Sequence, residues 1–128
     1  MKKSIFRSVS ALLAVVMILS VLPVAAFAAT NFFQRSVDGY TCVGSGAASA
    51  SYATGTLRAT ANPSEPVTPG VARVFVYAYD SSNELIGSRS GSGETYASAQ
   101  CVPSGSYTTA KFVFTFNSTN LGTYYLYP

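Results

Sequence analysis

The chain has 128 residues, with eight basic and five acidic side chains, two Cys, nine Tyr, no His and no Trp. The absence of His removes the most common general base, the most common metal ligand and the His-dependent Ser and Cys nucleophile systems. The composition therefore argues against most hydrolases and most zinc sites. We expect no catalytic residue, no metal site and no cofactor.

Residues 1–28 have the pattern of a helical secretory signal peptide. Three basic residues lie near the start: Lys2, Lys3 and Arg7. An apolar run from Ala11 to Leu22 follows, and a small-x-small motif ends at Ala28. We place the cleavage after Ala28, within the range 25–29. An uncleaved anchor is the alternative, but its length is near the lower limit for a membrane span, and Pro23 interrupts it.

Removal of this segment leaves a single domain over residues 29–128. The five remaining basic residues balance the five acidic ones, so the net side-chain charge is zero. Nucleic acid and anionic membranes are therefore unfavoured partners, because both attract basic proteins. No Cys stands directly after the cleavage region, and no apolar tail ends the chain. We expect a secreted, extracellular protein of bacterial type with no membrane anchor after signal removal.

The remaining pattern is all-β, because short runs rich in Thr, Val, Tyr and Phe alternate with Gly, Pro, Ser and Asn. Six or seven strands in about 100 residues predict an antiparallel sandwich of two sheets. The predicted strands are 37–43, 48–61, 71–79, 84–88, 95–101, 108–116 and 123–127. The second strand contains Gly55, where it has a possible break.

Three connections stand out between these strands. Residues 62–70 hold three Pro and are expected to cross between the sheets. Residues 80–83, Asp-Ser-Ser-Asn, predict a hairpin turn. Residues 87–93, Gly-Ser-Arg-Ser-Gly-Ser-Gly, are predicted to be a mobile connection, with a contact loop as the alternative.

The two cysteines, Cys42 and Cys101, are expected to form a disulfide, which is the default in an exported chain. Such a bridge would close a long loop and contribute about 4 kcal/mol. We expect it to join the two sheets. Two free thiols are the alternative.

Two strands show which of their faces should be buried. Phe112, Phe114 and Phe116 share one face, which we place in the core beside Cys101 and the small side chains near it. In the 71–79 strand, one face consists of Val and Ala. The other face carries Arg73, Phe75, Tyr77 and Tyr79.

Because Arg is rarely buried without a partner, we place the Val-Ala face inside. This turns Arg73, Phe75, Tyr77 and Tyr79 toward solvent as an aromatic stripe, the predicted binding residues. The alternative has the rings inside, with Arg73 reaching solvent at the rim.

Other chemistry finds less support in the sequence. Glu84 and Glu94 are the best pair for glycoside hydrolysis, but nothing fixes their separation. The acidic turn beginning at Asp80 lacks the Gly and Glu of a calcium-binding EF-hand, which leaves a loose surface site as an alternative to a plain turn.

We therefore expect a non-catalytic β-sandwich that acts by contact with an extracellular protein or glycan surface. The alternative function is that of a bacteriocin-like or toxin-like antagonist that acts on another cell's envelope.

Overall fold

The computed structural model describes residues 30–64 and 69–128. Within these ranges no helix is long and apolar enough to cross a membrane. The predicted signal peptide lies outside the described residues, as does the middle of the 62–70 connection. Eight strands are present: β1 (Thr30–Val37), β2 (Tyr40–Ala48), β3 (Ala53–Ala61), β4 (Ala72–Tyr79), β5 (Leu85–Gly93), β6 (Tyr96–Cys101), β7 (Thr109–Phe116) and β8 (Thr119–Leu126).

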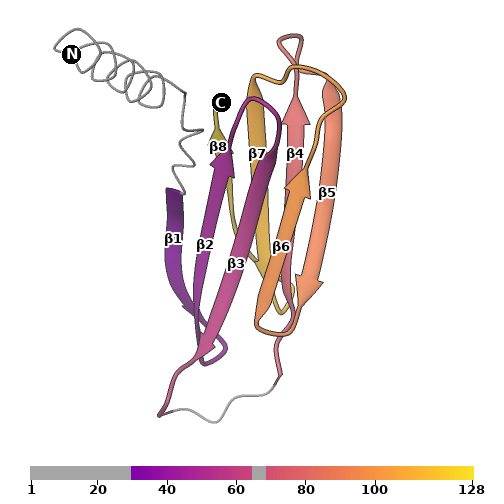
Figure 1. The fold of residues 1–128 in the computed structure, drawn as a ribbon. Helices are drawn as coiled ribbons and strands as arrows, with labels where there is room; N and C mark the ends of the chain where they lie inside the picture. Colours follow the sequence, from indigo (N-terminus) through magenta and orange to yellow (C-terminus); the bar gives the residue numbers. More distant parts are fainter. Residues whose placement is uncertain (1–29, 65–68) are drawn as a thin grey trace, which may run out of the picture.

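The strands form two antiparallel four-stranded sheets that lie against each other (Figure 1). We name the sheet with strand order β1-β2-β3-β6 sheet A, and the sheet with order β5-β4-β7-β8 sheet B. The chain changes sheet after β3, after β5 and after β6. The predicted all-β class and the predicted crossover between β3 and β4 are therefore confirmed. The strand count of six to seven was too low.

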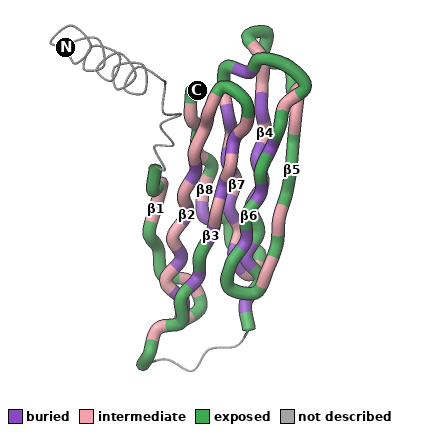
Figure 2. Tube along the Cα trace, in the orientation of Figure 1, coloured by how far each residue is buried: buried purple, intermediate pink, exposed green. Residues whose placement is uncertain are grey.

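The core lies between the sheets, where alternate residues of the inner strands are buried (Figure 2). Tight turns join several neighbouring strands. Asp38-Gly39 joins β1 to β2 and Asn117-Ser118 joins β7 to β8, and all four residues have positive φ angles of 50° to 81°. Positive φ at both central residues is characteristic of the hairpin turns that match strand twist. These short turns fix the register of both hairpins.

The turn over residues 80–83 is confirmed as a hairpin between β4 and β5. One carboxylate oxygen of Asp80 accepts hydrogen bonds from the backbone N–H groups of Ser82, at 2.8 Å, and Glu84, at 3.0 Å. Asn83 has a φ of 62°, which Asn tolerates better than most residues. Asp80 thus acts as the cap of its own turn.

The Phe face of β7 is confirmed as core, since Phe112, Phe114 and Phe116 are fully buried. The prediction that these rings lie beside Cys101 and its small neighbours was wrong, because β6 faces β4. The rings instead lie over β2 and β3. A Cβ atom at Gly46 or Gly55 would come within 3.1 Å of Phe112. Large rings do pack against minimal side chains here, but the small residues are glycines of other strands.

Strand β1 was missed because its sequence does not alternate. Its pairing with β2 shifts register between Asn31 and Phe33, which marks a β-bulge. The bulge lets two consecutive rings reach the core. Phe32 stacks on Tyr124 with ring centroids 4.9 Å apart, and Phe33 meets Phe114 edge-on at 5.3 Å. An edge strand with mostly exposed side chains is thereby attached to the core.

The predicted mobile connection over residues 87–93 was wrong, because this segment lies within β5. Its pairing with β4 runs continuously from Ala72 opposite Gly93 to Ala78 opposite Gly87. Gly91 and Gly93 lie so close to the backbone of β6 that a Cβ atom on either would overlap a carbonyl oxygen. The lack of a side chain at these glycines allows two strands of different sheets to lie close together.

The predicted disulfide was wrong as well: Cys42 and Cys101 are buried free thiols. Both lie in sheet A, so neither joins the sheets. Cys42 pairs with Ala59 and Cys101 with Ala53, six residues apart along β3. At about 3.4 Å per residue this is roughly 20 Å along the strand, whereas bridged Cys residues have Cα atoms about 4.4–6.8 Å apart.

Burial raises the pKa of both thiols, which lowers the fraction present as reactive thiolate. We expect iodoacetamide at mildly alkaline pH to leave the native protein unmodified. After unfolding without a reductant, mass spectrometry should show two added carbamidomethyl groups. A protein that gains none after unfolding contains a bridge and contradicts the observed register.

Candidate functional site

The stripe predicted on β4 lies on the outer face of sheet B. The Val-Ala face of β4 is fully buried, with Ala72, Val74, Val76 and Ala78 at zero exposure. On the opposite face Arg73 is exposed, whereas Phe75, Tyr77 and Tyr79 are half-buried. The predicted orientation of this strand is confirmed. The rings are half-buried because β4 is an inner strand, flanked by β5 and β7.

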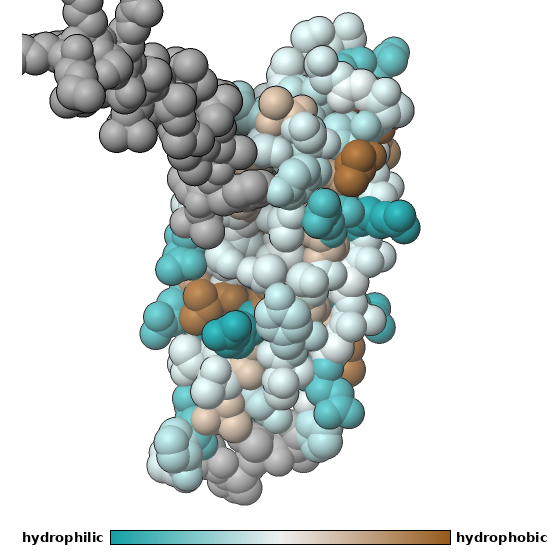
Figure 3. All heavy atoms as spheres, in the orientation of Figure 1, coloured by the Kyte–Doolittle hydropathy of each residue, from teal (hydrophilic) through white to brown (hydrophobic). Residues whose placement is uncertain are grey.

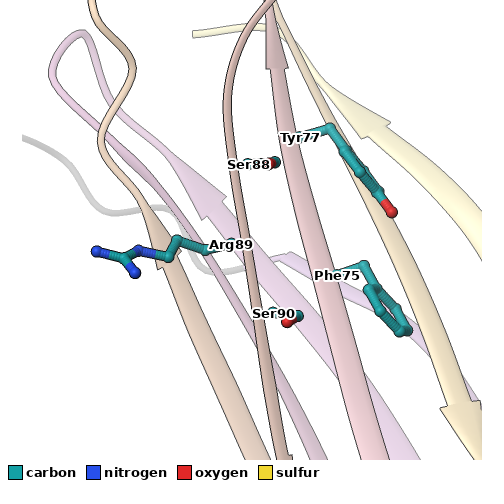
Figure 4. Close-up of a pocket in the computed structure, with 5 residues that line it drawn as sticks. All are labelled: Phe75, Tyr77, Ser88, Arg89 and Ser90. Atoms are coloured by element: carbon teal, nitrogen blue, oxygen red, sulfur yellow. The ribbon is translucent and has the colours of Figure 1, made fainter.

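Serines of β5 border one side of the stripe. Ser88 lies opposite Tyr77, Ser90 opposite Phe75 and Ser92 opposite Arg73. These side chains are too short to cover the neighbouring rings, and an open hollow of about 310 Å³ lies between them. In Figure 4 the side chains of Phe75, Tyr77, Ser88 and Ser90 point to one side of the sheet, and Arg89 points to the other. Arg89 therefore borders the hollow without projecting its guanidinium into it.

Strands β7 and β8 border the other side of the stripe. Phe75 lies opposite Val113 and Tyr77 opposite Lys111. The Lys111 ammonium lies 5.4 Å from the centroid of the Tyr77 ring, within the range of a cation–π interaction. Tyr125 follows Lys111 in the same row on β8 and is 51% exposed. The outer face of sheet B thus combines aromatic rings, hydroxyl groups and two cations, Arg73 and Lys111.

A second outer surface, on sheet A, was not predicted from the sequence. Residues of β1, β2, β3 and β6 border a hollow of about 380 Å³: Asn31, Val43, Ser45, Thr56, Arg58 and Tyr96. The Arg58 guanidinium lies 6.0 Å from the centroid of the Tyr96 ring. The Ser45 and Thr56 hydroxyls are 2.5 Å apart and share a hydrogen bond. Figure 3 shows this face as mostly pale, between hydrophilic and hydrophobic.

The alternation of β2 and β3 shows which of their residues point outward. It does not show that Tyr96, from β6, lies beside Arg58. Only the pairing of β3 with β6 brings these two side chains together. This second surface offers less aromatic area than the outer face of sheet B. It carries one ring, Tyr96, whereas the outer face of sheet B carries several.

The structure separates the two acids considered for glycoside hydrolysis. Glu84 precedes β5 and Glu94 follows it, so the nine residues of that strand lie between them. At about 3.3 Å per residue they lie roughly 30 Å apart, whereas paired catalytic carboxyl groups lie about 5–9.5 Å apart. This pair cannot act together on one glycosidic bond.

Metal binding gains no support at the Asp80 turn, where one carboxylate oxygen accepts two backbone hydrogen bonds. In the part of the chain that the structure describes, no group of three or more Cys, Asp or Glu side chains is placed to hold a metal ion.

A buried tyrosine outside the stripe has a structural role that the sequence did not indicate. Tyr107, in the connection between β6 and β7, donates its hydroxyl toward the backbone carbonyls of Ser49 and Tyr52. Burial raises the pKa of this phenol. The contact ties the β6–β7 connection to the turn between β2 and β3, across the two sheets. Tyr107 is therefore unavailable as a surface contact.

The fold defines the class of protein as an all-β domain of two four-stranded antiparallel sheets. No family model, curated protein or solved structure matches the chain. The outer surfaces of the two sheets are therefore the features that bear on function.

Proposed function

We propose that this protein is a secreted, non-catalytic β-sandwich that acts by contact with an extracellular glycan or protein surface. The contact residues are those of the stripe on β4: Arg73, Phe75, Tyr77 and Tyr79. The observation that carries the proposal is the row of half-exposed rings on the outer face of sheet B, beside an open hollow bordered by serines. Rings with a polar edge are enriched at binding surfaces, because they offer a large contact area at a small entropic cost.

Secretion is part of the proposal and is supported by the pattern of residues 1–28. The protein should be recovered from the culture medium of producing cells with a new N-terminus near residue 29, as determined by mass spectrometry. Recovery only from the cell pellet, with residues 1–28 intact, contradicts export.

The contact role is tested by co-sedimentation of the purified protein with washed cell envelopes. We expect Tyr77→Ser to weaken binding at least about fivefold, because truncating a side chain central to an interface costs more than about 1 kcal/mol. The melting temperature should change little, since the ring lies on the outer face. Tyr96→Ser is the matched control, because Tyr96 is also a ring beside a cation but lies on sheet A. It should leave binding unchanged.

Two results would overturn the contact role of the stripe. A large fall in melting temperature for Tyr77→Ser would mean that its ring stabilises the core. Equal binding by the wild-type protein and Tyr77→Ser would mean that another surface makes the contact. Growth inhibition of related bacteria by the purified protein would favour the antagonist function instead.

A further inference from the structure

The charges of the described residues are sorted between strands and turns. All five basic residues that the structure describes lie in strands: Arg35, Arg58, Arg73, Arg89 and Lys111. None of the eight strands contains an Asp or Glu. The four described acids lie in turns: Asp38, Asp80, Glu84 and Glu94. In the part of the chain that the structure describes, the only charged side chains carried by the strands are therefore cations.

Two of the turn acids are already engaged within their own part of the fold. Asp80 caps the β4–β5 turn. Asp38 accepts a hydrogen bond of 3.1 Å from the side-chain amide of Asn117, which links the β1–β2 turn to the β7–β8 turn. Asp38 thus joins the ends of the two sheets, Asp80 stabilises a single turn, and the described strands carry no negative side chain.

On the outer face of sheet B, Arg73 lies at one end of the ring row, and Lys111 lies beside the middle ring, Tyr77. Arg73 pairs with Thr115, and Lys111 pairs with Tyr77, so they are offset by four residues along the strands. At about 3.4 Å per residue they lie roughly 14 Å apart. Phe75 lies between them along the strands, Tyr77 lies level with Lys111, and Tyr79 lies beyond it. A ligand that covers Phe75 and Tyr77 therefore meets Arg73 beyond the first ring and Lys111 beside the second.

The ammonium of Lys111 beside the Tyr77 ring adds a further constraint. A ligand that contacts this ring also approaches the ammonium, and no strand of the described sheet carries an acidic side chain that would offset its charge. Electrostatic complementarity of this kind selects partners by charge. An anionic ligand is favoured on this face, and a cationic one is disfavoured.

We infer that the outer face of sheet B binds an acidic polysaccharide, an inference that rests on the proposed contact function of the same face. The rings supply apolar area for the C–H faces of sugars, and Ser88 and Ser90 supply hydroxyl groups for their polar edges. Arg73 and Lys111 pair with carboxylate groups on the polymer. A polynucleotide fits less well, because it carries a phosphate at every nucleotide and its binding proteins line the path with many cations.

The test uses affinity electrophoresis and calorimetry with three acidic polymers: polygalacturonate, alginate and hyaluronate. Carboxyl-reduced polygalacturonate is the neutral control, and a single-stranded oligonucleotide is the competing anion. We expect binding to at least one acidic polymer, weakened by added salt because salt screens exposed charges. Reduction of the carboxyl groups of polygalacturonate should weaken its binding at least about fivefold.

Arg73→Gln and Lys111→Gln should each weaken binding about two- to fivefold, the loss expected for an exposed ion pair. Arg58→Gln is the matched control, since Arg58 also lies beside a Tyr ring but on sheet A. It should leave binding unchanged. The inference is overturned by tighter binding of the oligonucleotide, by failure to bind any acidic polymer, or by a larger loss with Arg58→Gln.

Equal binding to the neutral polymer also overturns the inference. In that case Tyr77→Ser separates it from the proposed function. If Tyr77→Ser still loses envelope binding, the contact face stands and only its preference for acidic ligands is wrong. If Tyr77→Ser binds envelopes as well as wild type does, both conclusions fail.

Discussion

Phe114→Ala should destabilise the protein by about 3–5 kcal/mol, the usual cost of removing a fully buried ring. Phe114 has zero exposure and lies among three other rings, with centroid distances of 6.0 Å to Phe32, 5.3 Å to Phe33 and 6.0 Å to Tyr124. Two of these rings belong to β1. The substitution therefore removes contacts between the two sheets and weakens the attachment of an edge strand. Urea unfolding followed by far-UV circular dichroism measures the loss.

Val113→Ala is the control for this experiment, because Val113 is the preceding residue of β7 and points to the outer face. We expect a cost of no more than about 1 kcal/mol for this half-exposed position. If Val113→Ala proves more destabilising than Phe114→Ala, the assignment of the two faces of β7 is reversed.

Gly91→Ala should be destabilising by an amount near the top of the ~1–3 kcal/mol range for overpacking, or above it. A Cβ at this position would lie 2.8 Å from the carbonyl carbon of Ser98 and would overlap its oxygen. These are backbone atoms of β6, so no side-chain rotation relieves the clash. Edge strand β5 of sheet B would have to move away from edge strand β6 of sheet A.

Gly105→Ala is the matched control, because nothing lies within 4 Å of a Cβ at that position. It should leave the melting temperature within a few degrees of wild type. Equal stability of Gly91→Ala and Gly105→Ala, by thermal unfolding, would mean that β5 and β6 are not in close contact.

The β5 segment shows why a local reading of composition fails. Its glycines and serines resemble a flexible linker. In the structure the serines Ser88, Ser90 and Ser92 alternate outward, so the segment does have the period of a strand. The pattern was hidden because the inward positions hold mostly Gly, which is not apolar. Gly91 and Gly93 occupy inward positions because the backbone of β6, in the other sheet, lies too close for a side chain.

The cysteines illustrate a second limit. Their number and the predicted export favour a disulfide, but pairing requires two Cα atoms within a few ångströms of each other. That distance depends on where β2 and β6 each meet β3. Neither the composition nor the spacing of the two Cys along the chain reveals this register. The expectation that two Cys of an exported chain form a disulfide was therefore wrong here.

Three features could be predicted from the sequence: the all-β class, the buried Phe face of β7 and the outward aromatic stripe of β4. These follow from the alternation of side chains within one strand, which is a local property of the extended backbone. Three features depended on the pairing of strands: the separation of the cysteines, the Arg58 and Tyr96 surface of sheet A, and the position of Lys111 beside Tyr77 on sheet B. Each of these depends on which strands become neighbours and in what register. The neighbours and the register of each strand depend on packing between segments that are distant in the chain. The alternation of side chains within one strand does not determine them.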